Sequence, residues 1–409
     1  GSLVPIGVVL GNVSFEGFVG LTGLSWLLRS ILAFAWKEPG VGESFDRLKS
    51  HPLVLPYFVW YVVILISFFC NAPDMDKLGY NIAFIRHLLF VAAAVDISQR
   101  LPVCKYFLYG LAGGVLWAGI NTLAVHLAGF DLIGNPISYY NGKRQAAPRI
   151  AWLASLSAPF FWGWAVATFH KHASTKKHLF IERRETLVTV TLIAVVLILI
   201  SDIRTFILAM VIGLFWVSVL SGKKALVKNI FILGGVTVVI GVLFFNLDSF
   251  QRIESINHRF YIWKVSWLMS IDHPIIGTSV SAYKEVFSQY ASADLAAMFN
   301  LSNPSDPIWA WANSAHNLFL MVFTVTGVSG LLAFLWLLIN AIRSSWQPNQ
   351  LGWSLGLASW PATFLAIGMV GTNIYDGTSA ALFVFFLGLI GGRDNAEELS
   401  VDSEKRVVS

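Results

Sequence analysis

Long apolar runs separated by short polar segments dominate the pattern along the chain. About 20 mostly apolar helical residues cross a bilayer core of about 30 Å, so such runs predict membrane-spanning helices. The twelve predicted spans are 3–15, 17–36, 53–70, 80–97, 103–127, 150–169, 184–200, 203–220, 228–246, 316–341, 351–371 and 377–392. The first is the weakest, because Gly11 and Asn12 interrupt it. We therefore expect an all-α polytopic integral membrane protein with about 12 transmembrane helices.

Composition agrees with this pattern and excludes several other classes of protein. Of the 409 residues, 56% are hydrophobic and only 12% are charged, about half the roughly 25% that is usual for soluble domains. An ordinary water-soluble enzyme, a disordered chain, a collagen and a coiled coil are all excluded. The net charge is +5. In a membrane protein such charge marks cytoplasmic loops and anionic lipid, so we expect membrane lipid and no nucleic acid as a partner.

The distribution of Lys and Arg predicts the orientation in the membrane. An even number of spans places both termini on one side. Basic residues concentrate in the loops that follow even-numbered spans, most clearly around 171–184 and 223–228. The positive-inside rule therefore predicts that both termini are cytoplasmic.

One connection is far longer than the others and lies on the outer side in this topology. The chain divides into spans one to nine (3–246), this connection (247–315), spans ten to twelve (316–392) and a polar tail (393–409) that we expect to be disordered. The long connection should form a folded helical cap. Within it, Phe260, Trp263, Trp267 and Ile271 recur at helical spacing, which predicts an amphipathic helix at the membrane surface.

Basic side chains gather at one depth of the predicted topology. Arg86, Arg204 and His316 all fall towards the outer ends of their spans, and Arg252 and Arg259 lie above them in the cap. Ionisable groups near the bilayer interior are costly and usually functional. Each also has a plainer interpretation, because an arginine at a helix end can reach up to lipid headgroups and a histidine can cap a helix.

The composition of this cluster indicates its chemistry. Guanidinium groups bind phosphate oxygens through a planar fork and keep their charge, so the expected ligand is a lipid phosphate or diphosphate. Histidine can take a proton from a hydroxyl near neutral pH. Together they suit transfer of a group from a lipid diphosphate to an alcohol, and this arrangement requires no metal ion and no cofactor.

Three segments resemble the O-antigen ligase and polymerase superfamily. The segment AHNLFLMVFTVTGVSGLLAF, with His316, is similar to the family's His-Asn-x-x-Leu signature followed by glycine. RFYIWKVSWLMSIDHPIIGTS resembles the family's Arg, Trp, Pro-x-x-Gly stretch, and SDIRTFILAMVIG resembles its Ser-x-x-Arg segment. Ser279 departs from the glycine usual after Pro-x-x-Gly-x, and no motif surrounds Arg86.

The resemblance implies a GT-C-like glycosyltransferase of the bacterial inner membrane with a periplasmic active site. Such an enzyme moves a glycan from undecaprenyl diphosphate, without a metal and with inversion at the anomeric carbon. It implies that His316 is the general base or orients the acceptor, and that Arg204 and Arg259 bind the diphosphate, with help from Arg86 and Arg252.

In an O-antigen ligase the acceptor is a hydroxyl of lipid A-core, and this is the activity we expect. Polymerisation of repeat units and O-glycosylation of a protein are alternatives within the superfamily. Transport of an anionic lipid, or binding as a scaffold, are alternatives from other classes, although a transporter should carry charge at mid-membrane depth.

Overall fold

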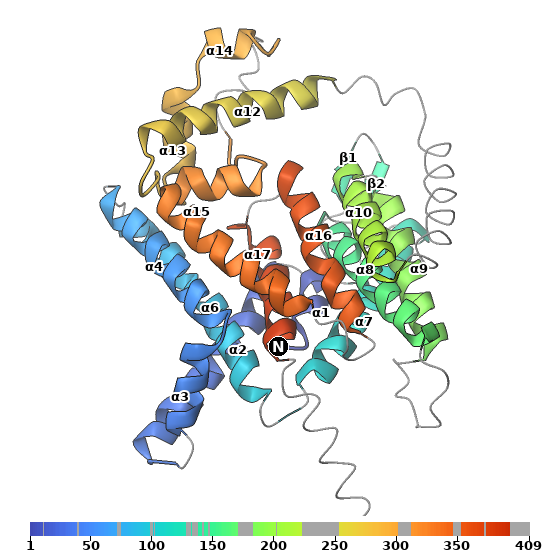
Figure 1. Cartoon of the computed structure of the whole chain (residues 1–409). Coiled ribbons are helices and arrows are strands. Elements are labelled where there is room, and N and C mark those ends of the chain that lie inside the picture. Colours follow the sequence, from blue (N-terminus) through green and yellow to red (C-terminus); the bar gives the residue numbers. More distant parts are fainter. Residues whose placement is uncertain are drawn as a thin grey trace, which may run out of the picture.

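Helices make up nearly all of the described structure (Figure 1). The computed structural model describes residues 1–10, 12–38, 41–71, 75–98, 101, 103–127, 132, 138–140, 143–145, 148–170, 183–201, 203–222, 253–301, 312–346, 353–371 and 374–392. The strands within these ranges form a single antiparallel hairpin, in which β1 (Ser138–Tyr140) pairs with β2 (Lys143–Gln145).

Five helices of the described part are long and apolar enough to cross a membrane. They are α2 (Asn12–Ala35), α7 (Val103–Leu127), α8 (Pro148–His170), α9 (Arg184–Ser201) and α15 (Leu318–Ser345). A sixth candidate is the pair of α3 (Val41–Ser50) and α4 (Val54–Cys70), which is bent by 73°. Shorter apolar helices are α10 (Arg204–Leu220), α16 (Ser354–Val370) and α17 (Gly377–Gly391). The chain is thus a multi-pass membrane protein.

Two of the twelve predicted spans are wrong, because the structure does not have one continuous helix over either range. A third predicted span lies outside the described residues. Instead of a span over 3–15, the structure has the seven-residue helix α1 (Val4–Leu10), which is too short to cross a bilayer. α2 begins at Asn12 and absorbs the rest of that run. The span over 80–97 is divided at Phe84 into α5 (Leu78–Ala83) and α6 (Ile85–Ile97). The span over 228–246 falls among the undescribed residues.

Aromatic packing around α17 forms the interior of the helical bundle. α17 lies at the centre in Figure 1, and from Thr378 to Gly391 every residue is buried. The rings of Phe364 and Phe383 lie 5.0 Å apart between α16 and α17. α8 approaches α16 closely because Gly163 faces Gly356, where an added Cβ would lie 2.7 Å from the Gly356 Cα atom. Such small residues allow membrane helices to approach each other without a large side chain between them.

Three helices of the predicted cap lie across one end of the bundle, at the top of Figure 1: α12 (Ile253–Asp272), α13 (Tyr283–Tyr290) and α14 (Ala293–Ala297). α12 has a buried face and an exposed apolar face, as expected for the predicted amphipathic helix. It buries Tyr261 and Val265, whereas Phe260 and Trp267 are each 49% exposed. A helix with these two faces can pack on the protein and still present an apolar surface outwards.

Candidate functional site

A break in α15 joins the cap to the bundle. Gly327 has φ 65° and ψ −168°, so the helix stops there and resumes after one residue. In an unbroken helix the N–H groups of Val328 and Ser329 would bond to the carbonyls of Thr324 and Val325. The break leaves these four backbone groups to find other partners.

The loop after α12 supplies all four partners. The Val328 N–H donates to Pro274 O at 2.8 Å, and the Ser329 N–H donates to Ile275 O at 3.3 Å. In return, the N–H groups of Thr278 and Ser279 donate to Thr324 O at 2.9 Å and Val325 O at 3.0 Å. The Pro-x-x-Gly stretch seen in the sequence is therefore a structural clamp, which we call the α15 clamp (Pro274–Ser279 with Thr324–Ser329).

Two glycines make the clamp possible, because the two backbones touch. A Cβ on Gly277 would lie 2.4 Å from Thr326 N, and one on Gly327 would lie 2.2 Å from the carbonyl carbon of Ile275. Both glycines also have a positive φ, 67° and 65°. Ser279, the departure from the family pattern, has φ 73° and is therefore held in a conformation that favours glycine.

Replacing Ser279 with glycine should stabilise the protein by about 0.5–1 kcal/mol. Glycine removes the strain of the left-handed backbone, about 1–2 kcal/mol, and this gain exceeds the extra conformational entropy that a glycine loses on folding. The measurement is the thermal unfolding midpoint in detergent. Ser281→Gly is the matched control, since it removes the same Ser279–Ser281 hydroxyl contact of 3.1 Å at a residue without a positive φ. An equal effect of the two substitutions would contradict the strain at Ser279.

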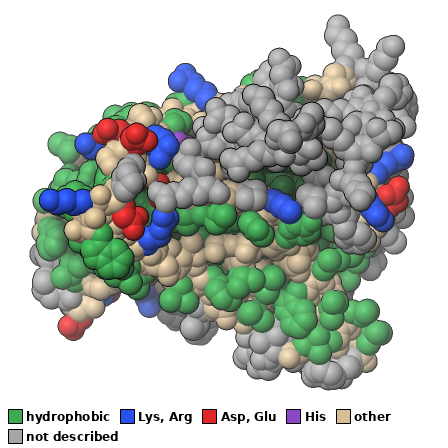
Figure 2. All heavy atoms as spheres, turned by 90° about the horizontal axis from the view of Figure 1, so that it is seen from below, with side chains coloured by type: hydrophobic (Ala, Val, Ile, Leu, Met, Phe, Trp, Pro, Cys, Tyr) green, Lys and Arg blue, Asp and Glu red, His purple; other side chains and the backbone are tan. Residues whose placement is uncertain are grey.

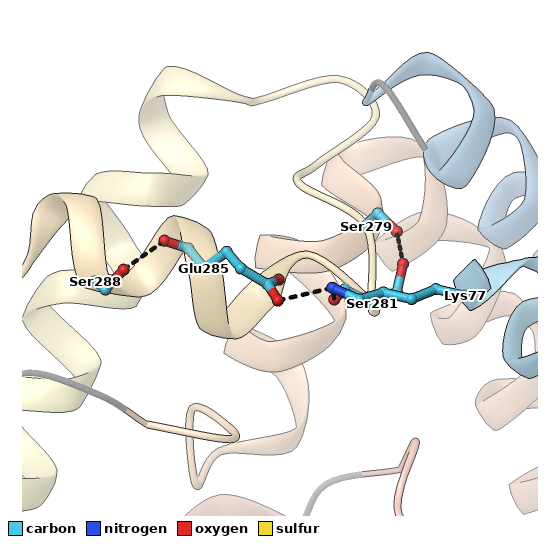
Figure 3. A network of polar contacts seen from close by, with 5 residues as sticks. All are labelled: Lys77, Ser279, Ser281, Glu285 and Ser288. Atoms are coloured by element: carbon cyan, nitrogen blue, oxygen red, sulfur yellow. Dashed lines mark hydrogen bonds and ion pairs between the residues drawn. The ribbon is translucent and has the colours of Figure 1, made fainter. Parts of the chain in front are cut away.

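A second set of polar contacts ties the clamp to the bundle from the side (Figure 3). Lys77, at the end of the 3-10 turn η1 (Met75–Lys77), donates to Glu285 of α13 at 2.7 Å and to Ser281 O at 3.3 Å. The Lys77 hydrogen bond lowers the pKa of Glu285 below its usual value. This exposed ion pair helps to orient α13, although such pairs contribute little stability.

His316 lies at the same junction, two residues before α15 begins. Its φ of 48° is in the left-handed region, and its side chain is half-buried. The next residue, Asn317, caps α15 by accepting the Leu320 N–H at 3.0 Å, and its amide donates to Met369 O of α16 at 3.1 Å. Asn317 thus fixes the backbone, while the described residues offer the His316 ring no hydrogen-bond partner.

The cap brings cationic groups to His316. Burial is the main cause that lowers the pKa of His316 below its ordinary value of 6.5, and the positive charges of Arg259 and His258 on α12 lower it further. His316 is therefore mostly neutral at pH 7, which is the form that can accept a proton. Arg259 is half-buried.

The lowered pKa of His316 predicts how activity falls on the acid side of the pH–activity profile, which we call the acid limb. Activity that needs neutral His316 should persist below pH 6.5 and fall only as the pH drops through the lowered pKa. Arg259→Gln removes one cause of the lowering, so the limb should move to higher pH in that variant. The measurement is kcat/KM against pH, with Lys264→Gln on the same helix as control. An unchanged limb in Arg259→Gln would contradict the coupling.

Arg204 begins a helix that contacts the same end of α16 as Asn317 does. It is the first residue of α10 and is exposed. Its neighbour Thr205 lies against the end of α16, where a Cβ on Gly371 would be 3.3 Å from Thr205 Cγ2. Asn317 bonds to Met369 O of that same helix, so the starts of α10 and α15 both contact the C-terminal end of α16.

Arg86 is engaged elsewhere, and Arg252 lies outside the described residues. The Arg86 Nε donates to Glu16 of α2 at 2.5 Å and its Nη1 donates to Ala83 O at 2.7 Å. His87 Nε2 lies 3.7 Å from the same carboxylate. This pairing supports a structural role for Arg86. It also occupies some of the guanidinium N–H groups expected to bind the diphosphate.

Sequence reasoning missed two residues that act on predicted site residues, Glu16 on Arg86 and His258 on His316. Glu16 fell in the gap between two predicted spans, although a carboxylate inside an apolar run is itself a signal for a buried partner. His258 precedes Arg259 and was not distinguished from the surrounding cap residues. Only the proximity of α12 to His316 makes it relevant.

Comparison with known proteins gives one family. Residues 189–335 match the model of the O-Antigen ligase family, and this segment contains Arg204, Arg259, the α15 clamp and His316. No curated protein matches the chain.

Proposed function

We propose, from the chain's membership of the O-antigen ligase superfamily, that it transfers O-antigen polysaccharide from undecaprenyl diphosphate to a hydroxyl of lipid A-core. Members of this superfamily are glycosyl-transferring enzymes. The observation that carries the proposal is a neutral, half-buried His316 beside Arg259, within the matched segment. A base that is neutral at pH 7 and a permanent cation together suit a hydroxyl acceptor and a diphosphate leaving group.

The proposed reaction is a single inverting displacement. A ring nitrogen of His316 takes the proton of the acceptor hydroxyl as its oxygen attacks the anomeric carbon. The bond from that carbon to the diphosphate oxygen breaks, and undecaprenyl diphosphate leaves with the bonding electrons. Arg204 and Arg259 stabilise the growing negative charge on the diphosphate, so these residues supply the electrostatic stabilisation without a metal. Arg252 and Arg86 have supporting roles in the proposal, and that of Arg86 requires its pair with Glu16 to open.

The proposed setting is the bacterial inner membrane. Both termini face the cytoplasm, and the cap and His316 face the periplasm, where the polysaccharide donor and lipid A-core meet. The multi-pass helices and the concentration of basic residues in alternate loops support this orientation.

A reconstituted transfer reaction tests the proposal. The purified protein in liposomes receives undecaprenyl-diphosphate-linked polysaccharide and lipid A-core, with and without a metal chelator. A chelator-resistant shift of lipid A-core to a glycosylated form is the expected result. Lengthening of the donor glycan would indicate a polymerase, and glycosylated protein would indicate an O-oligosaccharyltransferase. Movement of the donor across the bilayer without a new bond would indicate a transporter.

A further inference from the structure

A pocket lies at the end of the bundle opposite the cap, among α2, α3 and α6. Its lining includes Trp26 and Arg29 of α2, Phe45 and Leu48 of α3, and Asp96 of α6. α3 runs at 73° to α4, so it leaves the direction of the membrane helices and closes one side of the pocket. Figure 2 views this end of the molecule and shows charged side chains of both signs beside hydrophobic ones on the side where α3 lies. The proposed catalytic chemistry uses none of these residues.

Two opposite charges face this pocket without pairing with each other. Asp96 is only 7% exposed, and its Oδ2 accepts the indole N–H of Trp26 at 2.9 Å. A carboxylate has room for further hydrogen bonds, and a buried one is stabilised when they are made. Arg29 is exposed, and no carboxylate of the described residues lies within ion-pair distance of it. The pocket therefore offers one acceptor site for a cation and one donor fork for an anion.

The surface of α2 beside the pocket is apolar, as expected for a helix that faces lipid. α2 exposes a row of large apolar side chains: Leu21 63%, Leu24 59%, Leu28 57% and Ile31 55%. Arg29 and Asp96 thus lie where an apolar helix surface meets a helix that carries Glu43, Asp46, Arg47 and Lys49. A ligand here would have acyl chains along α2 and a headgroup in the pocket.

We propose that this pocket binds the headgroup of a phospholipid that carries both a phosphate and a primary ammonium group, as phosphatidylethanolamine does. The ammonium group hydrogen-bonds to Asp96, and the phosphate binds the guanidinium of Arg29. The buried carboxylate disfavours a purely anionic headgroup, because it would face a like charge. A trimethylated headgroup has no N–H to donate.

The test measures lipid binding to the purified full chain in detergent by native mass spectrometry and by thermal unfolding. Phosphatidylethanolamine, phosphatidylglycerol and phosphatidylcholine are titrated separately, together with soluble phosphoethanolamine. The wild-type chain should bind phosphatidylethanolamine at least about tenfold more tightly than the other two lipids, as expected for one charge-assisted hydrogen bond. Soluble phosphoethanolamine should give no comparable stabilisation, because it lacks the acyl chains.

Variants separate the two charges. Asp96→Asn keeps an acceptor for Trp26 and should reduce phosphatidylethanolamine binding to the level of phosphatidylglycerol. Arg29→Gln, at an exposed residue, should weaken both, and Lys49→Gln on α3 is the matched control. Equal binding of the three lipids, or unchanged binding in Asp96→Asn and Arg29→Gln, would overturn the proposal. Equal stabilisation by soluble phosphoethanolamine would overturn the assignment to a lipid. The inactive His316→Ala chain should bind like the wild type, so this test is independent of the glycosyltransferase proposal.

Discussion

Replacing His316 with alanine should lower the rate of glycan transfer about 10²- to 10⁴-fold, the usual contribution of a positioned general base. The residue lies at the junction of the cap and the bundle, where Asn317 makes the capping contacts and no described residue is hydrogen-bonded to the His316 ring. The loss should appear in kcat, with binding of the undecaprenyl-diphosphate donor little changed. The measurement is the initial rate of lipid A-core glycosylation in liposomes, with donor binding measured separately.

His273→Ala is the matched control for this substitution. His273 directly follows α12 in the same cap, and it is not among the groups that perturb His316. Its variant should transfer glycan at nearly the wild-type rate. Retention of the wild-type rate by His316→Ala would exclude His316 as the base. A loss of donor binding without a change in kcat would instead assign it to substrate binding.

Replacing Gly327 with alanine should destabilise the protein by about 3–5 kcal/mol, since it adds left-handed strain of about 1–2 kcal/mol and disrupts several hydrogen bonds of about 0.5–1.5 kcal/mol each. The added Cβ would lie 2.2 Å from both the carbonyl carbon and the oxygen of Ile275, so the backbone of the clamp must move apart. Hydrogen exchange at Thr278 and Ser279 should accelerate, because their N–H groups lose the carbonyls of α15. Transfer activity should fall as well, since the clamp holds the cap that carries Arg259.

Gly20→Ala provides the control within a membrane helix. Apart from the backbone of α2 and the two chain neighbours, no described atom lies within 4 Å of the Cβ that this substitution would add, so it should be neutral or slightly stabilising. Gly277→Ala should resemble Gly327→Ala, because its Cβ would lie 2.4 Å from Thr326 N. A Gly327→Ala protein that unfolds at the wild-type temperature, with protected Thr278 and Ser279 amides, would contradict the clamp.

Much of the helical architecture could be predicted from the sequence, because apolar runs in a membrane protein end where the helices end. The predicted span over 184–200 differs from α9 (Arg184–Ser201) by one residue, and the run over 103–127 coincides with α7. The errors occur where hydropathy does not report backbone geometry. The runs around α1 and α5 are apolar enough to be predicted as spans, yet their helices are short.

The candidate site residues could be named from the sequence, and their roles stay predictions, whereas their arrangement required the structure. The predicted topology puts His316 and Arg259 on one side of the membrane, but their proximity depends on how the cap folds back over α15. The charge on Arg86 predicts a ligand. Its pairing with Glu16 could not be predicted from the sequence, because that pairing depends on how α2 packs against α6. Ser279 illustrates a further limit, since a serine gives no signal of a positive φ.

The α15 clamp also constrains the order of biogenesis. Its two halves are separated in the chain, with Thr278 and Thr324 46 residues apart. While α15 enters the bilayer, the carbonyls of Thr324 and Val325 have no loop to bond to, and unpaired backbone groups in hydrocarbon cost several kcal/mol each. α15 is therefore expected to insert as one continuous helix and to open at Gly327 only when the cap docks. Completion of the site around His316 would then be the last step of maturation, so a chain with an undocked cap could be inserted, stable and inactive.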